Sequence, residues 1–126
     1  MNHSCPFCTL PPERIVVANE VGWIVRDAYP VTNGHTLVIP RRHISSFFEL
    51  ASDERQRLLE LLDIARAGLD VDLHPQGYNI GINDGPAAGQ TVPHLHIHLI
   101  PRYEGDIPDP RGGVRWVIPN KAKYWT

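Results

Sequence analysis

The feature that most constrains the fold is a run near residue 95 in which histidines alternate with aliphatic residues. Residues 94–99 read His-Leu-His-Ile-His-Leu. An apolar period of two predicts a half-buried β-strand whose aliphatic side chains face the core. The three imidazoles would then share the opposite face, roughly 6.6 Å apart at about 3.3 Å rise per residue. Imidazole can act as nucleophile, base or acid near neutral pH, so this face is predicted to bind phosphates.

The histidine run also has a purely structural interpretation and a metal-binding one. One histidine on a strand is usually an ordinary surface or core residue, but three on one face after Gly89-Gln90-Thr91 are harder to explain structurally. A zinc ion held by all three rings is conceivable, because imidazole is the commonest zinc ligand. However, the outer two Cα atoms would lie about 13 Å apart on a regular strand. A single ion at ~2.1 Å from each ring would then be awkward to place.

The length of 126 residues predicts one domain over 1–126, with a core over about 5–103 and a tail over 104–126. Its 42% hydrophobic and 21% charged content is that of an ordinary globular protein. The net charge of −2 offers no general attraction for nucleic acid or membrane, so any phosphate binding must be local. Neither a signal peptide nor an apolar stretch of membrane-spanning length is expected. The expected compartment is the cytoplasm.

Cys5 and Cys8 form a Cys-x-x-Cys pair and are the only cysteines in the sequence, so a disulfide scaffold is not expected. In a cytosolic chain such a pair indicates redox chemistry or half of a zinc site. A redox pair of the thioredoxin type opens a helix, and the prolines at 11–12 disfavour a helix there. Half of a zinc site needs two further ligands from elsewhere in the chain.

His43 and His94 are the candidates for those two ligands. If the strand ending at Pro40 runs antiparallel to the strand starting at His94, the end of the first lies beside the start of the second. Two thiolates and two imidazoles would complete a tetrahedral structural zinc site. His3 is a weaker, spare ligand, and a plain exposed thiol pair is the alternative.

The remaining patterns predict an α+β fold with a five-stranded antiparallel sheet, one main helix and a short helix over 44–50. The expected strands cover residues 14–18, 22–26, 35–40, 78–83 and 94–100. Ser52 is expected to cap the main helix, which ends at 74–77. Its expected apolar stripe consists of Leu58, Leu59, Leu61, Leu62, Ala65 and Leu69.

The run at 94–100 resembles the motif of the histidine triad (HIT) family, whose members bind nucleotides and hydrolyse or transfer them. The segments 83–86 and 88–91 are similar to the approach segment of the fragile histidine triad (Fhit) branch, and 34–40 matches another family block. The resemblance implies a HIT-like fold that pairs as a homodimer with a joined ten-stranded sheet. Some bacterial members also carry the Cys-x-x-Cys pair with matching histidines and bind zinc.

The resemblance implies a role for each candidate residue. His96 would attack the α-phosphorus to give a nucleotidyl-histidine, His98 would contact the bridging oxygen and protonate the leaving group, and Gln90 would contact the α-phosphate, without a catalytic metal. The implied nucleotide-binding residues are Val25, Asp27, His35, Leu37, Asn83, Gln90, Thr91 and His98. Core packing explains Val25 and Leu37 equally well, and a role as a turn residue explains Asp27.

Three classes of function compete for these residues. The favoured class is a nucleotide hydrolase or transferase acting on dinucleoside polyphosphates, adenylate esters or nucleoside phosphoramidates. A nucleotide-binding regulator with little activity is the second, and a zinc-organised interaction module is the third. The expected partners are a nucleotide substrate and a second copy of the chain, with neither nucleic acid nor membrane. The arginines of the tail over 104–126 could contact substrate phosphates, or the tail could pack against a neighbouring subunit, but surface decoration is the favoured interpretation.

Overall fold

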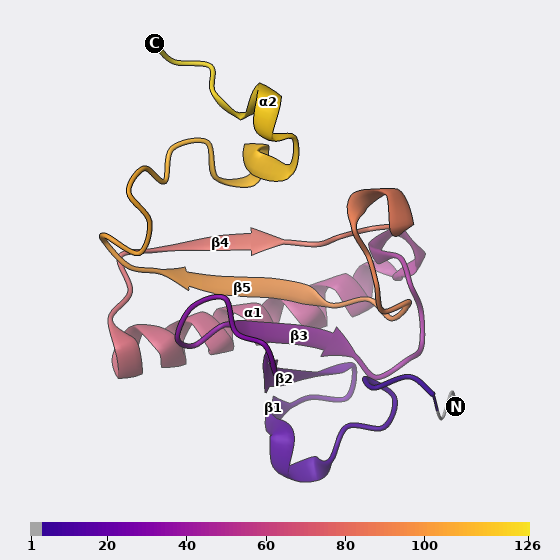
Figure 1. Cartoon of the computed structure of the whole chain (residues 1–126). Coiled ribbons are helices and arrows are strands. Elements are labelled where there is room, and N and C mark those ends of the chain that lie inside the picture. Colours follow the sequence, from indigo (N-terminus) through magenta and orange to yellow (C-terminus); the bar gives the residue numbers. More distant parts are fainter. Residues whose placement is uncertain (1–3) are drawn as a thin grey trace.

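The computed structural model describes residues 4–126, so the spare ligand His3 lies outside the described residues. Five antiparallel strands form one sheet in the order β1-β2-β3-β5-β4, and the long helix α1 covers one face of it (Figure 1). The strands are β1 (Ile15–Ala18), β2 (Gly22–Arg26), β3 (Thr36–Pro40), β4 (Gly77–Gly81) and β5 (Ile97–Arg102). The α-helices are α1 (Ser52–Leu73) and α2 (Pro119–Ala122), and the 3-10 helices are η1 (Pro12–Arg14), η2 (Phe47–Glu49), η3 (Pro86–Ala88) and η4 (Gly113–Val117). The predicted fold class is confirmed.

The N-cap of helix α1 lies one residue earlier in the sequence than predicted. Ala51 is the N-cap, and its backbone N–H donates to the Glu54 carboxylate at 2.9 Å. Ser52 is therefore the first helical residue, and the prediction that it caps the helix is wrong. The helix ends at His74, which adopts a left-handed conformation with φ of 50°.

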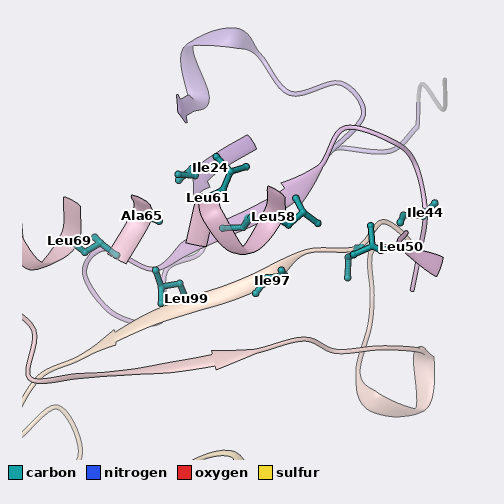
Figure 2. Packing of buried hydrophobic residues seen from close by; sticks show 11 residues of the cluster. Ile24, Ile44, Leu50, Leu58, Leu61, Ala65, Leu69, Ile97 and Leu99 are labelled. Carbon is teal, nitrogen blue, oxygen red and sulfur yellow. The ribbon is translucent and has the colours of Figure 1, made fainter. Parts of the chain in front are cut away.

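The main core lies between α1 and the sheet (Figure 2). Leu58, Leu61, Ala65 and Leu69 of α1 are buried against aliphatic residues of the sheet such as Ile97. Leu62 packs at the edge of this cluster, whereas Leu59 is 48% exposed. The apolar stripe is therefore narrower than predicted, because the sheet meets only one side of the helix.

The histidine run departs from the regular strand that its alternation predicts. The strand begins only at Ile97, and the preceding backbone bends: the His94 N–H donates to the Val92 carbonyl and the Leu95 N–H donates to the Ile44 carbonyl. The aliphatic members of the run are buried in the main core, as predicted. His94 is fully buried, and its ring hydrogen-bonds to the Pro40 carbonyl and lies against the cysteine sulfurs, whereas the rings of His96 and His98 lie beside each other.

The opposite face of the sheet carries a smaller apolar cluster that the N-terminal segment covers. Val25, Leu37 and Ile39 form this cluster, and Phe7 and Leu10 of the N-terminal segment pack on it. The tail over 104–126 lies beyond the β4 edge (Figure 1). In the part of the chain that the structure describes, no helix is both long and apolar enough to cross a bilayer.

A pair of glycine substitutions tests this packing. A Cβ added at Gly22 would lie 2.6 Å from the Ile39 carbonyl oxygen and 2.7 Å from a Leu58 methyl, whereas one added at Gly68 on α1 would meet nothing within 4 Å. We expect Gly22→Ala to lower the free energy of unfolding by about 1–3 kcal/mol. We expect Gly68→Ala to raise it by about 1 kcal/mol. Urea denaturation of both variants measures this, and equal effects would contradict the packing described.

Candidate active site and metal cluster

Four side chains from distant parts of the sequence meet where β3 ends and the segment before β5 begins. Cys5 and Cys8 come from the N-terminal turn, His43 follows β3, and His94 precedes β5. His94 Nδ1 lies 3.4 Å from Cys5 Sγ, 3.5 Å from Cys8 Sγ and 3.1 Å from His43 Nδ1. Cys8 Sγ lies 3.1 Å from His43 Nδ1. The four residues predicted as metal ligands are therefore brought together.

The chemistry of this donor set fits a bound metal ion. His94 Nε2 donates to the Pro40 carbonyl at 2.8 Å, so the electron pair of the neutral ring is on Nδ1, which faces both sulfurs. Burial lowers the pKa of His94, which also favours the neutral ring that a metal requires. Adjacent ligand nitrogens around tetrahedral zinc lie about 3.3 Å apart, close to the spacing observed. Two sulfurs and two imidazoles fill all four positions, so this is a structural donor set.

His96 follows the metal cluster and is held by the same residue. Its Nδ1 donates to the carbonyl oxygen of His94 at 2.8 Å. A carbonyl oxygen only accepts, so the proton of the neutral ring is on Nδ1 and the electron pair is on Nε2. The ring lies 5.1 Å from the ring of His98, centroid to centroid. The nitrogen with the electron pair is the one that can act as a nucleophile.

His98 is held in the opposite tautomer by its neighbour His35. The Val31 backbone N–H donates to His35 Nδ1 at 3.0 Å, so His35 carries its proton on Nε2. That Nε2 lies 2.9 Å from His98 Nδ1 and 3.4 Å from an Asp27 carboxylate oxygen. Nδ1 of His98 therefore accepts, and the ring presents Nε2–H. Side by side, His96 offers an electron pair and His98 offers a donor.

The hydrogen bonds of His35 argue against a metal ion at Asp27, His35 and His98, although the ligand atoms of these residues lie within 4.8 Å of one another. A metal bound to His35 Nε2 would require the ring proton to move to Nδ1. There it would face the Val31 N–H, placing two donors against each other. Of these two clusters in residues 4–126, the cluster with the cysteines is the better metal site, because the electron pair on His94 Nδ1 is directed at its centre.

Burial favours the neutral forms of His35 and His98, which are hydrogen-bonded to each other. Burial, followed by the nearby His96 and His35, lowers the pKa of His98 to about 4, and Asp27 opposes this only weakly. Burial likewise lowers the pKa of His35, against the opposing charge of Asp27. The hydrogen bonding of His35 favours the same neutral state, because a protonated His35 ring would place a second donor against the Val31 N–H.

A cavity of about 560 Å³ opens beside His98 and His35. Its floor includes Ile100 of β5 and Gly81 of β4, and its outer wall includes Trp116 of the tail. The predicted residue Asn83 also lines it. The tail therefore lines part of this cavity, whereas surface decoration was the favoured prediction for it.

Gln90 holds the loop before β5 in its observed shape. Its side-chain oxygen accepts from the Gly85 N–H at 2.8 Å, and its amide nitrogen donates to the carbonyls of Ser45 at 2.9 Å and Val92 at 3.1 Å. Both amide hydrogens are thus engaged with the backbone, so a contact to a phosphate requires one of these bonds to exchange. The neighbouring Thr91 is exposed.

Asp84, in the segment that resembles Fhit, has a structural role. Its carboxylate accepts from the Ser46 hydroxyl at 3.1 Å and from the Phe47 N–H at 2.9 Å, which fixes the start of η2. The short helix predicted over 44–50 is this single 3-10 turn. The segment therefore ties the loop to the turn after β3.

The predicted base-binding pair, Val25 and Leu37, is buried at 0% and 3% exposure under the N-terminal segment. Asp27 is half-buried and accepts from the Tyr29 N–H at 2.8 Å. Sequence reasoning missed Phe7, whose ring centroid lies 5.0 Å from that of His96. Its position between the two cysteines was the available signal.

Comparison with known proteins agrees with this geometry. The model of the HIT domain matches residues 10–105, most of the chain. The chain belongs to the HIT family.

Three HIT relatives illustrate the match. A HIT-like protein of Methanocaldococcus jannaschii is 39% identical over 81% of this chain and 81% of its own length. A bifunctional bis(5'-adenosyl)-triphosphatase/adenylylsulfatase of Arabidopsis thaliana is 34% identical over 77% of this chain and 54% of its own. The crystal structure of a zinc-bound histidine triad family protein from Mycobacterium smegmatis aligns with a TM-score of 0.72 and 35% identity, covering 94% of both chains.

The lowered pKa of His98 has a consequence for stability. In the unfolded chain this ring takes up a proton below about pH 6.5, whereas the folded protein resists protonation until about pH 4. The unfolded state binds more protons in this window, so the stability of the wild type falls as pH falls from 6.5 to 4. We expect His98→Asn to flatten that part of the profile, measured by urea denaturation at stepped pH.

The matched control is His74→Asn, at the exposed end of α1, where asparagine suits the left-handed backbone. This control should follow the wild-type profile. Parallel profiles for His98→Asn and wild type would contradict a ring kept neutral by burial.

Proposed function

We propose that this HIT protein is a nucleotide hydrolase or transferase that acts at the α-phosphorus of its substrate through a nucleotidyl-histidine on His96. The observation that carries the proposal is the hydrogen bond from His96 Nδ1 to the His94 carbonyl oxygen. That bond leaves the Nε2 electron pair available for attack. It also stabilises the positive charge that the ring acquires once it is bound to phosphorus. Neither a regulator without turnover nor an interaction module requires this arrangement.

The reaction divides into two displacements at phosphorus. In the first, a bond forms between His96 Nε2 and the α-phosphorus, and the bond from phosphorus to the bridging oxygen breaks, so the leaving group departs with the electron pair. In the second, water or another acceptor attacks phosphorus and the phosphorus–nitrogen bond breaks. The electron pair returns to Nε2, and the acceptor's proton passes to solvent.

His98 shapes the choice of leaving group in this proposal. Its Nε2–H is proposed to donate a hydrogen bond to the bridging oxygen. Because the ring is neutral and its Nδ1 already accepts from His35, it stabilises a departing anion better than it delivers a proton. Leaving groups that depart as anions are therefore favoured, such as the phosphate chain of a dinucleoside polyphosphate or the acid part of an adenylate ester. The amine of a phosphoramidate needs a proton and is disfavoured.

The rest of the site supports the same substrate class. The cavity beside His98 has room for the part of the substrate beyond the bridging oxygen. The base is proposed to bind at the apolar cluster of Val25 and Leu37, which Phe7 covers in this structure, and the Asp27 carboxylate is proposed to accept from ribose hydroxyls. The Arabidopsis relative is named as a bis(5'-adenosyl)-triphosphatase, which agrees with the resemblance of 83–91 to the Fhit branch.

Replacing the nucleophile tests the proposal directly. We expect His96→Asn to lower kcat with diadenosine triphosphate on the order of 10³-fold or more, because the residue acts mainly in the transition state. Nucleotide affinity and the melting temperature should remain close to those of the wild type. His74→Asn is the matched control and should keep full turnover. Retention of most activity in His96→Asn would contradict the covalent mechanism.

We also propose that the metal of the cysteine and histidine cluster is zinc with a structural role; the similar Mycobacterium smegmatis protein is zinc-bound, which supports the identity of the metal. Protein purified without chelator should contain close to one zinc per chain by elemental analysis. Chelation should lower the melting temperature, because the ion ties the N-terminal segment to the sheet. The same chelator should leave the melting temperature of a Cys5→Ser, Cys8→Ser double variant unchanged. A metal-free preparation of full stability would contradict this role.

A homodimer with a joined ten-stranded sheet is a further part of the proposal. β4 is an edge strand, and edge strands of small sheets are commonly protected by pairing. Such pairing has to accommodate the tail, which lies beyond this edge (Figure 1). Sedimentation at micromolar concentration should give about twice the chain mass of 14.2 kDa. A monomer under these conditions would contradict the joined sheet.

A further inference from the structure

Phe7 connects the metal cluster to the proposed nucleophile. It stands between Cys5 and Cys8 in the sequence, so its backbone belongs to the turn that carries both sulfur ligands. Its ring centroid lies 5.0 Å from that of His96, with an interplanar angle of 62°, and 5.9 Å from that of His94 at 85°. These are edge-on aromatic contacts, which stabilise one relative orientation of the rings.

The same side chain also covers the proposed base site. Phe7 packs on the cluster of Val25, Leu37 and Ile39, on the face of the sheet opposite to α1. Val25 and Leu37 are almost fully buried in this cluster, on which Leu10, Ile15 and Trp23 also pack. One ring therefore contacts both the nucleophile and the apolar floor on which a base would lie.

The position of this ring depends on the ligand turn. The Cys8 N–H donates to the Cys5 carbonyl at 3.2 Å, and the Thr9 hydroxyl donates to the same oxygen at 3.0 Å. These bonds make a short, tight turn whose two sulfurs are directed at His94. An ion that binds both sulfurs would fix Cys5 and Cys8, which are three positions apart, and Phe7 lies between them in the turn.

His94 provides a second connection between the same two sites. Its ring is directed at the sulfurs, and its backbone carbonyl accepts the His96 Nδ1 proton at 2.8 Å. The metal cluster therefore reaches His96 by two routes, through a backbone carbonyl and through an aromatic ring. A change at the cluster alters the surroundings of the nucleophile on two sides.

We propose that Phe7 is a positioning residue that couples metal occupancy of the cluster to the orientation of His96 and to nucleotide binding. This inference rests on the proposed zinc site and on the proposed nucleotide function. Since coupling between two binding events is reciprocal in free energy, zinc should strengthen nucleotide binding and nucleotide should strengthen zinc binding by the same factor. Couplings of this kind are typically about 5- to 150-fold.

The first experiment needs no nucleotide. In the zinc-loaded wild type, NMR should show nuclear Overhauser contacts between the ring protons of Phe7 and His96. Chelation should abolish these contacts, and one equivalent of ZnCl2 should restore them. Persistence of the contacts in zinc-free protein would overturn the coupling, whether or not a nucleotide binds.

Substitution at Phe7 covers the case in which zinc-free protein unfolds. Zinc-loaded Phe7→Leu should keep one zinc per chain while its His96 ring signals move away from their wild-type positions. Phe48→Leu is the matched control, because Phe48 is 75% exposed and packs on Phe47, away from the site. Wild-type His96 signals in Phe7→Leu would overturn the proposal.

The second experiment uses AMP as the probe, since it supplies base, ribose and α-phosphate. Zinc should lower the dissociation constant of AMP for the wild type at least fivefold, and saturating AMP should slow the transfer of zinc to a chromogenic chelator. In Phe7→Leu, zinc should change the AMP dissociation constant less than twofold, and AMP should change the rate of zinc transfer less than twofold. Phe48→Leu should behave like the wild type. Equal AMP affinity with and without zinc would overturn the coupling. Failure of AMP to bind in either state would instead overturn the nucleotide function, and the ring contacts would still decide the coupling.

Discussion

The direction of three hydrogen bonds to the backbone decides which chemistry each histidine of the site can perform. The Pro40 carbonyl takes the ring proton of His94, and the His94 carbonyl takes the ring proton of His96. The Val31 amide instead donates to His35, which obliges that ring to present its own proton to its neighbour. A neutral imidazole has one donor and one acceptor, so each backbone partner determines what the other ring nitrogen offers. One ring is thereby suited to a metal, one to nucleophilic attack and one to hydrogen-bond donation.

The fold places these backbone groups within reach of the rings. β3 and β5 pair in antiparallel register, with Leu37 opposite His98, which brings the end of one strand beside the start of the other. The bend before β5 turns His94 out of the strand and into the cysteine cluster. Gln90 supports this bend through three hydrogen bonds to backbone groups of the loop and the turn after β3. The helix packs on the opposite face, so the core and the chemistry occupy separate sides of the sheet.

Much of this organisation follows from local pattern in the sequence. Alternation in 95–99 correctly assigns the aliphatic side chains to the core, and the antiparallel geometry of β3 and the following strand correctly brings His43 beside His94. The bend at His94 was not predictable, because it depends on the Ile44 carbonyl, about fifty residues away, taking the Leu95 N–H. Side-chain period alone cannot distinguish a strand from a bent segment with the same alternation.

Other features of the site depend on tertiary contacts with no local signature. The capping of η2 by Asp84 and the approach of Trp116 to the cavity join segments that are distant in sequence. The tautomer of His94 likewise follows from the Pro40 carbonyl, which lies more than fifty residues away in the sequence, and that of His98 follows from His35. Residue type and spacing therefore predicted which side chains would be candidates for the chemistry, while the direction of their protons required the structure.

The tautomeric state of each ring can be read from ¹⁵N chemical shifts of histidine in the zinc-loaded protein at neutral pH, and it decides whether these hydrogen bonds assign the chemistry. The hydrogen bonds require the proton on Nε2 in His94, His35 and His98 and on Nδ1 in His96. A proton on Nδ1 of His98, or on Nε2 of His96, would contradict the assignment of donor and nucleophile on which the proposed mechanism depends.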